Sequence, residues 1–284
     1  MRLAWVAVVP VKSLATAKSR LAPASDVRRR ALALSFAVDT VAALRAVPEI
    51  RTVVVVTAET AVAAEVGGPD VETLPEPAEG GLNAAITAGV DWSRSQHADA
   101  GVVVIAADLP ALRSRDVAAV LRIASAHPRT VLADREGTGT TMLTGLPVTP
   151  PRPQFGSESL ARHRAEGALV IDGPDLDRAA RDVDTPDHLT EARRLGIGAA
   201  TLQVLDTDRR SVRRQATVAS FDPGTQAGEV LLDDGTRLDL PAGVWRSATG
   251  RSLRRGQRVV VDVDAGGRVR LVHLLTIEPT GEQT

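Results

Sequence analysis

The chain of 284 residues contains no cysteine and no tyrosine, and aromatic residues make up only 2% of it. The absence of cysteine excludes disulfide bonds, thiolate metal sites and cysteine nucleophiles, and it is typical of a reducing compartment. Because hydrophobic residues still make up 44% of the chain, we expect a sizeable core of valine, leucine, alanine and isoleucine.

Long hydrophobic runs and excess charge are also missing. No run approaches the roughly 18 apolar residues of a membrane-spanning helix. Met1 and Arg2 lead into only about eight apolar residues, without the small-residue cleavage site of a signal peptide. A formal net charge of −1 gives no bulk attraction to nucleic acid or to a membrane surface. We therefore expect a cytoplasmic protein with no membrane partner.

Lysine is scarce as well. Only two of the 34 basic residues are lysines, and both, Lys12 and Lys18, lie in the short segment after the first apolar run. An ammonium group is a compact point charge on a flexible stem, whereas a guanidinium is a rigid planar fork. Either the two lysines are a remnant of codon bias, or this segment is an anion site that requires ammonium groups, such as a phosphate site.

The first two thirds of the chain alternate between buried strands and helices. Continuous β-branched runs such as 52–57 are typical of strands that are covered on both faces. The expected strands are 3–9, 52–57, 71–74, 101–106 and 130–133. The expected helices are 27–46, 58–66, 82–95, 114–126, 157–166 and 186–195. This alternation predicts an α/β, Rossmann-like domain with a mostly parallel sheet and helices on both faces.

Near residue 200 the pattern changes to short strands separated by tight turns. These strands are expected at 216–221, 228–232, 236–240, 257–264 and 268–277. Five short strands in about 65 residues predict a small antiparallel β-barrel. We therefore expect two domains, the first at 1–200 and the second at 214–279.

The loop after the first strand combines cations with hydroxyl groups. Ligands of open parallel sheets bind beyond the carboxyl ends of the strands, where this loop lies. Its candidate anion-binding residues are Lys12, Ser13, Lys18 and Arg20. This set suits a triphosphate, although the loop lacks the spacing of a Walker motif. A solvated basic loop is the alternative.

Aspartates occur where later strands are expected to end. Asp108 directly follows the run 101–106, and Asp182 and Asp184 are two residues apart, which places both side chains on one face of an extended segment. Carboxylates together with substrate phosphates are the ligands that Mg²⁺ prefers. Each of these acids could instead cap a helix or end a strand.

Two glycine-containing segments could approach an anion closely. Residues 137–141 are small and hydroxyl-rich, and residues 155–159 open a helix whose free N–H groups favour anions. A hairpin turn and an ordinary serine cap are the alternatives. The five histidines show no metal-ligand spacing and no Ser/Asp partner pattern, so we expect most of them to be exposed.

These segments occur in the order found in a known protein family. The segments that carry the resemblance are 9–14, 17–21, 81–85, 107–110, 137–141, 155–159 and 182–186. Over about residues 1–200 the chain resembles the CofC/FbiD family. Its members are the phosphoenolpyruvate (or 2-phospho-L-lactate) guanylyltransferases of coenzyme F-420 biosynthesis, a branch of the MobA-like nucleotidyltransferases.

The resemblance implies a reaction. The phosphate of phosphoenolpyruvate attacks the α-phosphorus of GTP, pyrophosphate leaves, and enolpyruvoyl-2-diphospho-5′-guanosine forms. It implies a Mg²⁺ site at Asp108, Asp182 and Asp184. It also implies that the phosphorylated three-carbon acid is bound by Thr141, Gly156 and Ser159.

The resemblance further implies that the GTP phosphates are held by Lys12, Ser13, Lys18 and Arg20. Asn83 is expected to contact guanosine, and Lys12, Lys18 and Asp108 are the expected catalytic set. The next enzyme of the coenzyme F-420 pathway is a candidate partner.

Several alternatives stay open. The arginine- and alanine-rich composition is typical of a high-GC bacterium, and bacterial family members resemble phosphoenolpyruvate enzymes, so phosphoenolpyruvate is favoured over 2-phospho-L-lactate. Another MobA-like nucleotidyltransferase, acting on a sugar phosphate or a molybdopterin, is a second reading.

The C-terminal segment leaves a third reading, because residues 249–259 resemble the last third of a cold-shock domain, an OB-fold. Such domains stack bases on clustered aromatic side chains, yet this region has only Phe221 and Trp245. From residue 201 onward there are 12 Arg and 11 Asp or Glu, so the region is not basic. Nucleic-acid binding is therefore less favoured than a docking, oligomerising or regulatory role.

Overall fold

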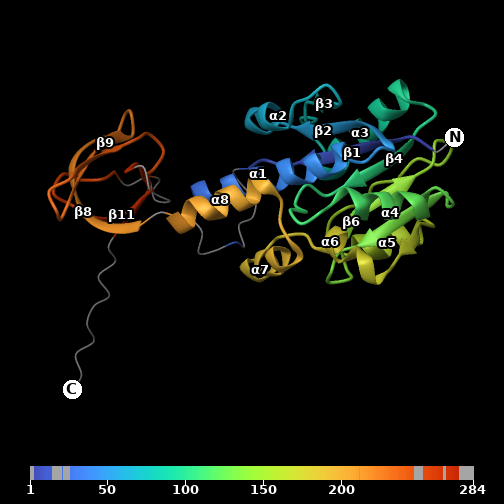
Figure 1. Ribbon diagram of the computed structural model, residues 1–284. Coiled ribbons are helices and arrows are strands. Elements are labelled where there is room, and N and C mark those ends of the chain that lie inside the picture. The colour runs from blue at the N-terminus through green and yellow to red at the C-terminus, as the bar shows by residue number, and fades with distance from the viewer. Residues whose placement is uncertain are drawn as a thin grey trace, which may run out of the picture. The chain divides into compact units, whose positions relative to one another are not determined.

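The computed structural model describes residues 3–14, 21, 26–210, 212–245, 252–264 and 267–274. The chain divides into two compact units, residues 1–202 and 203–284 (Figure 1). Within the described ranges, every helix is too short or too polar to cross a membrane.

The first unit is built on a seven-stranded sheet with the order β3-β2-β1-β4-β6-β5-β7. Its strands are β1 (Trp5–Val11), β2 (Ile50–Thr57), β3 (Val71–Leu74), β4 (Gly101–Ile105), β5 (Arg129–Ala133), β6 (Thr140–Gly145) and β7 (Leu169–Ile171). Strand β6 runs antiparallel to β4 and β5, and the other pairings are parallel. The prediction of a mostly parallel α/β sheet is confirmed.

Helices cover both faces of this sheet. The helices that the structure describes are α1 (Asp26–Arg45), α2 (Thr60–Val66), α3 (Gly81–Gln96), α4 (Ser114–Ala124), α5 (Ser159–Ala165), α6 (Asp177–Ala180), α7 (Pro186–Leu195) and α8 (Ala199–Arg210), with a 3-10 turn at Pro174–Leu176. Strand β1 shows why helices are needed on both faces of the sheet. Val6 and Val8 belong to one buried cluster, with Ile86 of α3. Ala7, on the opposite face of β1, belongs to another cluster, with Val41 of α1. Alternate side chains of this strand are therefore buried on both faces.

Strand β6 was not expected from the sequence, because its Gly- and Thr-rich start suggested a loop that approaches an anion or a hairpin turn. All six of its residues are buried. Its polar side chains are accommodated by pairing, as in the 2.7 Å hydrogen bond between the hydroxyls of Thr130 on β5 and Thr144 on β6. Tertiary pairing thus overrides a weak local preference for strand.

Helix α8 was also missed. The carboxylate of Asp39, on α1, accepts hydrogen bonds from the backbone N–H groups of Ala200 and Thr201, each at 2.9 Å. A carboxylate is a good cap for the free N–H groups of a first helical turn. This cap comes from a residue about 160 positions earlier in the chain. A local sequence pattern therefore could not predict where α8 begins.

The second unit contains a five-stranded antiparallel sheet with the order β10-β9-β8-β11-β12. Its strands are β8 (Val212–Asp222), β9 (Ala227–Leu232), β10 (Arg237–Leu240), β11 (Arg258–Val263) and β12 (Val269–Leu274). The backbone N–H of Val272 donates to the carbonyl of Val244 at 3.2 Å, so the segment after β10 meets β12. The sheet therefore curls into an antiparallel half-barrel around its own buried core.

Candidate functional site

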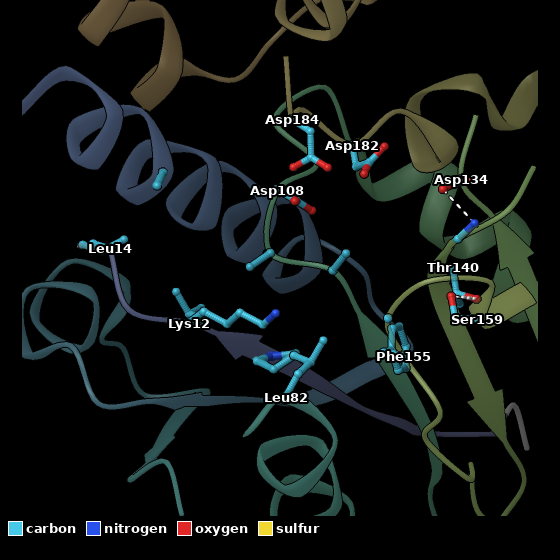
Figure 2. A pocket seen from close by; sticks show the side chains of 17 residues that line it. Lys12, Leu14, Leu82, Asp108, Asp134, Thr140, Phe155, Ser159, Asp182 and Asp184 are labelled. Carbon is cyan, nitrogen blue, oxygen red and sulfur yellow. Dashed lines mark hydrogen bonds between the residues drawn. The ribbon is translucent and has the colours of Figure 1, made fainter. Parts of the chain in front are cut away.

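A cavity of about 500 Å³ opens in the first unit at the carboxyl-end edge of the parallel strands. Its lining includes residues that follow β1, β4 and β5, together with the first residue of β6 (Figure 2). This is the edge at which open α/β sheets bind their ligands. Site residues that are distant in sequence thus meet because their strands end side by side.

Three aspartates converge on one side of the cavity. Carboxylate oxygens of Asp108, Asp182 and Asp184 lie within 4.8 Å of one another, and all three side chains are half-buried (Figure 2). Val183, between the latter two, is fully buried, and its N–H donates to the carbonyl of Asp108 at 3.1 Å. Residues 181–184 do not form a strand. Even so, the structure brings the three predicted metal ligands together.

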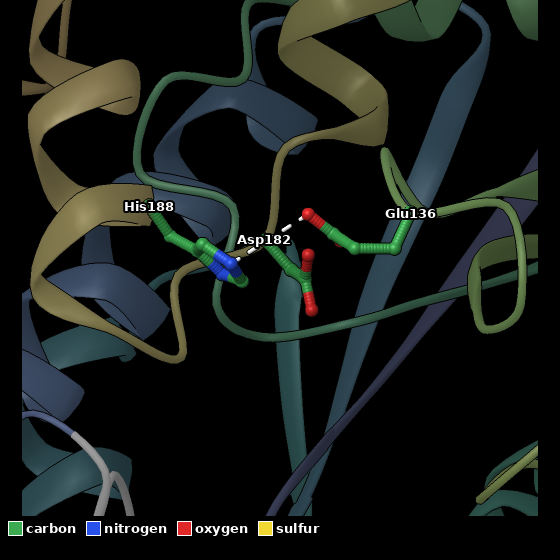
Figure 3. Close-up of side chains that lie close together, drawn as sticks. All are labelled: Glu136, Asp182 and His188. Atoms are coloured by element: carbon green, nitrogen blue, oxygen red, sulfur yellow. Dashed lines mark ion pairs between the residues drawn. The ribbon is translucent and has the colours of Figure 1, made fainter.

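A second acidic group lies beside the first and shares Asp182 with it. Oxygen and nitrogen atoms of Glu136, Asp182 and His188 lie within 4.8 Å of one another (Figure 3). Glu136 pairs with the guanidinium of Arg181 at 2.7 Å. Arg181 is 1% exposed and also lies 3.4 Å from Glu191. Its buried positive charge offsets part of the negative charge that the aspartates gather here.

Sequence reasoning missed the residues of this ion-paired layer. Arg181 and Glu136 are 45 positions apart in the chain, and neither stands in a motif with a recognisable spacing. The one indication in the sequence is that Arg181 directly precedes Asp182, which places the ion-paired residues next to the cluster of aspartates.

Lys12 follows β1 and lines the cavity, with its side chain reaching inward in Figure 2. The loop after β1 that carries Lys12 is held in place by Glu59, the residue before α2. Glu59 accepts hydrogen bonds from the hydroxyl of Ser13 and from the N–H of Leu14, both at 2.8 Å. The Ser13 hydroxyl thus helps to hold the loop, and its contact with GTP phosphates stays a prediction. Lys18 and Arg20 lie outside the described residues.

The loop before β6 is organised by Asp134. Its carboxylate accepts hydrogen bonds from the N–H groups of Thr138 (2.9 Å) and Gly139 (2.8 Å). A Cβ atom on Gly139 would lie 2.3 Å from the carboxylate, so a glycine is needed there. These two N–H groups therefore bind a carboxylate of the protein itself, and the cavity receives the side chain of Asp134 instead.

The acceptor residues expected from the sequence lie on or next to one wall of the cavity. Gly156 and Ser159 line it, and so does Thr140. Thr141 is 1% exposed, and its hydroxyl lies 3.5 Å from the carbonyl of Ala133. The structure thus adds Thr140 to the residues that line the cavity, and the role of Thr141 stays a prediction.

His163 stands directly behind this wall. It is fully buried, it forms hydrogen bonds with Thr140 and Gln154, both at 3.0 Å, and its ring packs edge-on against Phe155. Burial, with a smaller effect from the neighbouring Arg162, lowers the pKa of His163 to about 4. The expectation that most histidines are exposed is wrong, because the other four are half-buried.

Asn83 holds the segment that leads into the acceptor wall. Its amide nitrogen donates to the carbonyl of Phe155 at 3.1 Å, and its amide oxygen accepts from the N–H of Phe155 at 2.8 Å. Phe155 and Leu82 both line the cavity. The amide therefore positions Phe155 in this structure, and its contact with guanosine stays a prediction.

Comparison with known proteins gives matches over more than half of the chain. Residues 5–168 match the family described as guanylyl transferase CofC like. The chain is 45% identical over 202 residues to the phosphoenolpyruvate guanylyltransferase of Streptomyces scabiei (strain 87.22), covering 69% of this chain and 94% of that protein. It is 39% identical over 226 residues to the phosphoenolpyruvate guanylyltransferase of Thermomonospora curvata, covering 79% and 94%.

Among solved structures, one described as a nucleotide-diphospho-sugar transferase from Desulfovibrio desulfuricans G20 is similar, with a TM-score of 0.55. The match has 14% sequence identity and covers 72% of this chain and 95% of that chain. At this identity the likeness concerns the fold alone, which is a nucleotidyltransferase-like α/β fold.

Proposed function

The chain belongs to the family of CofC-like guanylyl transferases, and from this premise we propose that it joins the guanylyl group of GTP to phosphoenolpyruvate. The observation that carries this proposal is the identity of 45% with a phosphoenolpyruvate guanylyltransferase over nearly the whole length of that protein. The cavity supports it, since its lining combines acidic, basic and hydroxyl groups.

The reaction needs one bond to form and one to break. A phosphate oxygen of phosphoenolpyruvate bonds to the α-phosphorus of GTP, and the bond from that phosphorus to the bridging oxygen breaks. Pyrophosphate leaves with those electrons, and enolpyruvoyl-2-diphospho-5′-guanosine, an intermediate for coenzyme F-420, is the product. Because the attacking phosphate is already an anion, the protein has mainly to position the reactants and stabilise charge.

The three aspartates fit a hard divalent cation such as Mg²⁺. They offer oxygen ligands only, and those oxygens lie within 4.8 Å of one another. Such a cation prefers one or two carboxylates together with substrate phosphates. When bound, it would neutralise charge that builds up on the transferring phosphoryl group. Asp108, Asp182 and Asp184 would be its ligands.

The remaining predicted roles follow from where the side chains lie. Lys12 reaches into the cavity from the end of β1, where its ammonium group can pair with GTP phosphates, as we expect also for Lys18 and Arg20. Thr140, Gly156 and Ser159 form the acceptor wall, which would hold the phosphate or carboxylate of phosphoenolpyruvate through hydrogen bonds. Thr141, which follows Thr140 in β6, keeps its predicted role in binding the same substrate.

The second unit is assigned an accessory role. Strand β11 returns to lie beside β8, giving the order β11-β8-β9-β10, which is a Greek key and supports an OB- or cold-shock-like barrel. Trp245 is buried in its core, and Phe221 is partly buried against that core, so within 212–245, 252–264 and 267–274 neither tryptophan nor phenylalanine is exposed. This favours docking, with the next enzyme of the pathway as a candidate partner, over nucleic-acid binding.

The proposed reaction is tested by measuring pyrophosphate release with Mg²⁺, each of the four nucleoside triphosphates and a panel of acceptors. The panel contains phosphoenolpyruvate, 2-phospho-L-lactate and a sugar phosphate, and added pyrophosphatase pulls the equilibrium. We expect turnover that depends on both GTP and phosphoenolpyruvate. Turnover with only a sugar phosphate, or with only another nucleotide, would overturn the proposal.

A further inference from the structure

A chain of three hydrogen bonds ends at the cavity. The backbone N–H of Gln154 donates to Nε2 of His163 at 3.0 Å. Nδ1 of His163 lies 3.0 Å from the hydroxyl oxygen of Thr140. The hydroxyl of Ser159 donates to the same oxygen, also at 3.0 Å. His163 is fully buried, and Ser159 and Thr140 are 1% and 8% exposed, so the protein itself determines these partners.

The direction of each bond follows from what the groups can donate. A backbone N–H can only donate, so Nε2 of His163 must present its lone pair to Gln154. In a neutral imidazole the proton then lies on Nδ1, and Nδ1–H donates to Thr140. A hydroxyl oxygen has two lone pairs and one proton. Both lone pairs of Thr140 are thus occupied, by His163 and by Ser159.

The proton of the Thr140 hydroxyl is left for a third partner. Thr140 lines the cavity, so this proton is available to a ligand. We propose that His163 is a positioning residue for the acceptor substrate, which keeps the Thr140 hydroxyl as a hydrogen-bond donor toward an anionic group of phosphoenolpyruvate. The inference rests on the proposed function, because it deepens the recognition of the acceptor at the same site.

A charged imidazolium would break this arrangement. A proton on Nε2 would face the N–H of Gln154, with no acceptor between them. The lowered pKa of His163, about 4, agrees with a ring that stays neutral. Within the part of the chain that the structure describes, the charged group that affects this pKa is Arg162, and the ring contact is Phe155.

Three variants separate the two hydrogen bonds of His163. His163→Asn places an amide near the position of Nδ1 and can still donate to Thr140. His163→Gln places its amide near the position of Nε2, where it can accept from Gln154 but not reach Thr140. His163→Phe keeps the ring and removes both bonds. The matched variant at the other end is Thr140→Val, which removes the hydroxyl itself.

We expect His163→Gln and His163→Phe to raise the KM for phosphoenolpyruvate by about tenfold or more, the size expected for a lost hydrogen bond to a charged group. The KM for GTP should stay within about twofold, and His163→Asn should recover most of the loss. Adding His163→Phe to Thr140→Val should have no further effect, because the two act through one hydroxyl. Equal increases in both KM values, or an additive double variant, would overturn the inference.

A readout without turnover covers the case in which a variant fails to fold. Nitrogen-15 NMR of the full wild-type chain, labelled at histidine, reports which ring nitrogen carries the proton. We expect a neutral ring with the proton on Nδ1, before and after saturation with phosphoenolpyruvate. A proton on Nε2, or a ring that charges at neutral pH, would overturn the inference. Wild-type turnover tests the proposed function separately: an active wild type with indifferent His163 variants contradicts only the inference.

Discussion

The backbone N–H of Val183 donates to the carbonyl oxygen of Asp108 across 3.1 Å. This bond joins the end of β4 to the segment before α7, and it places Asp182 and Asp184 on either side of a buried valine. This backbone hydrogen bond helps to bring the three carboxylates, including that of Asp108, within 4.8 Å of one another. Substituting one of these carboxylates should therefore change the turnover of the protein while the backbone hydrogen bond between Val183 and Asp108 stays in place.

Asp108→Asn should lower kcat by about 100-fold or more, because an amide is a poor ligand for a hard cation and removes a charge from the site. The bond to Val183 uses the backbone carbonyl of Asp108, so thermal stability should change little. The measurement is steady-state pyrophosphate release together with a thermal melt. Asp187→Asn, in the exposed first turn of α7, is the matched control and should keep wild-type turnover. Wild-type activity in Asp108→Asn would remove this residue from the metal site.

Lys12→Arg keeps the positive charge but replaces a compact ammonium with a wider planar group. Because Lys12 reaches into the cavity, we expect the KM for GTP to rise by about fivefold to tenfold, with a larger rise in Lys12→Met. Lys18→Arg is expected to act in the same direction. Initial rates at varied GTP and saturating phosphoenolpyruvate make the measurement. Near-normal GTP kinetics in both arginine variants would show that the lysines are not required as ammonium groups.

Glu59→Ala should weaken GTP binding, although the loss of a negative charge would by itself favour an anionic ligand. Its carboxylate anchors Ser13 and Leu14, and removing it frees the loop that carries Lys12. We expect the KM for GTP to rise by about fivefold, with Glu59→Gln restoring most of the loss because its amide oxygen can still accept. Glu65→Ala is the control, because Glu65 is exposed on α2, the helix that directly follows Glu59. A fall in the KM for GTP would mean that the charge of Glu59 matters more than its anchoring.

Acid should destabilise the first unit through His163. The pKa of this residue is about 4 in the folded protein, below its ordinary value of 6.5. Between these values the unfolded chain binds the proton and the folded chain does not, so stability falls as the pH is lowered through this window. The contribution is on the order of 3 kcal/mol. Urea denaturation at neutral pH and near pH 4 should show a smaller loss in His163→Phe than in wild type. Equal losses in both proteins would contradict the assignment.

A chain that ends after Arg210 should keep its turnover. The cavity residues lie between Pro10 and Asp184, and α8 keeps its cap from Asp39. We expect kcat/KM within about threefold of the full chain. Circular dichroism checks that the shortened protein is folded, and a folded but inactive truncation would make the second unit part of the catalytic machinery.

Sequence patterns predicted the features that depend on local periodicity and on strand ends. Strands β1, β2 and β4 could be predicted because each contains an uninterrupted run of apolar residues. Asp108 could be predicted as a site residue because it follows such a strand. Which of Thr140 and Thr141 lines the cavity could not be predicted in this way, because it depends on the pairing register of β6, which shifts opposite Ala133.

Contacts between distant segments were equally hidden. No sequence pattern indicated that the amide of Asn83 holds Phe155, 72 positions away, and the predicted contact of Asn83 with guanosine stays a prediction. The hydroxyl of Ser13 meets Glu59, 46 positions away. His163 carries no motif, and its burial follows only from the packing of α5 against the sheet. Residue type and spacing thus indicated the kind of chemistry, while the folded contacts determine which groups are left to bind ligands.

The central claim is that a phosphate oxygen of phosphoenolpyruvate attacks the α-phosphorus of GTP. Phosphoenolpyruvate labelled with oxygen-18 in its phosphate group tests this directly, with mass spectrometry of both products after a reaction with GTP and Mg²⁺. The account predicts that all the label is found in the guanylylated product and none in pyrophosphate. Label in pyrophosphate, or no product that contains both the guanosine and the labelled phosphate, would contradict it.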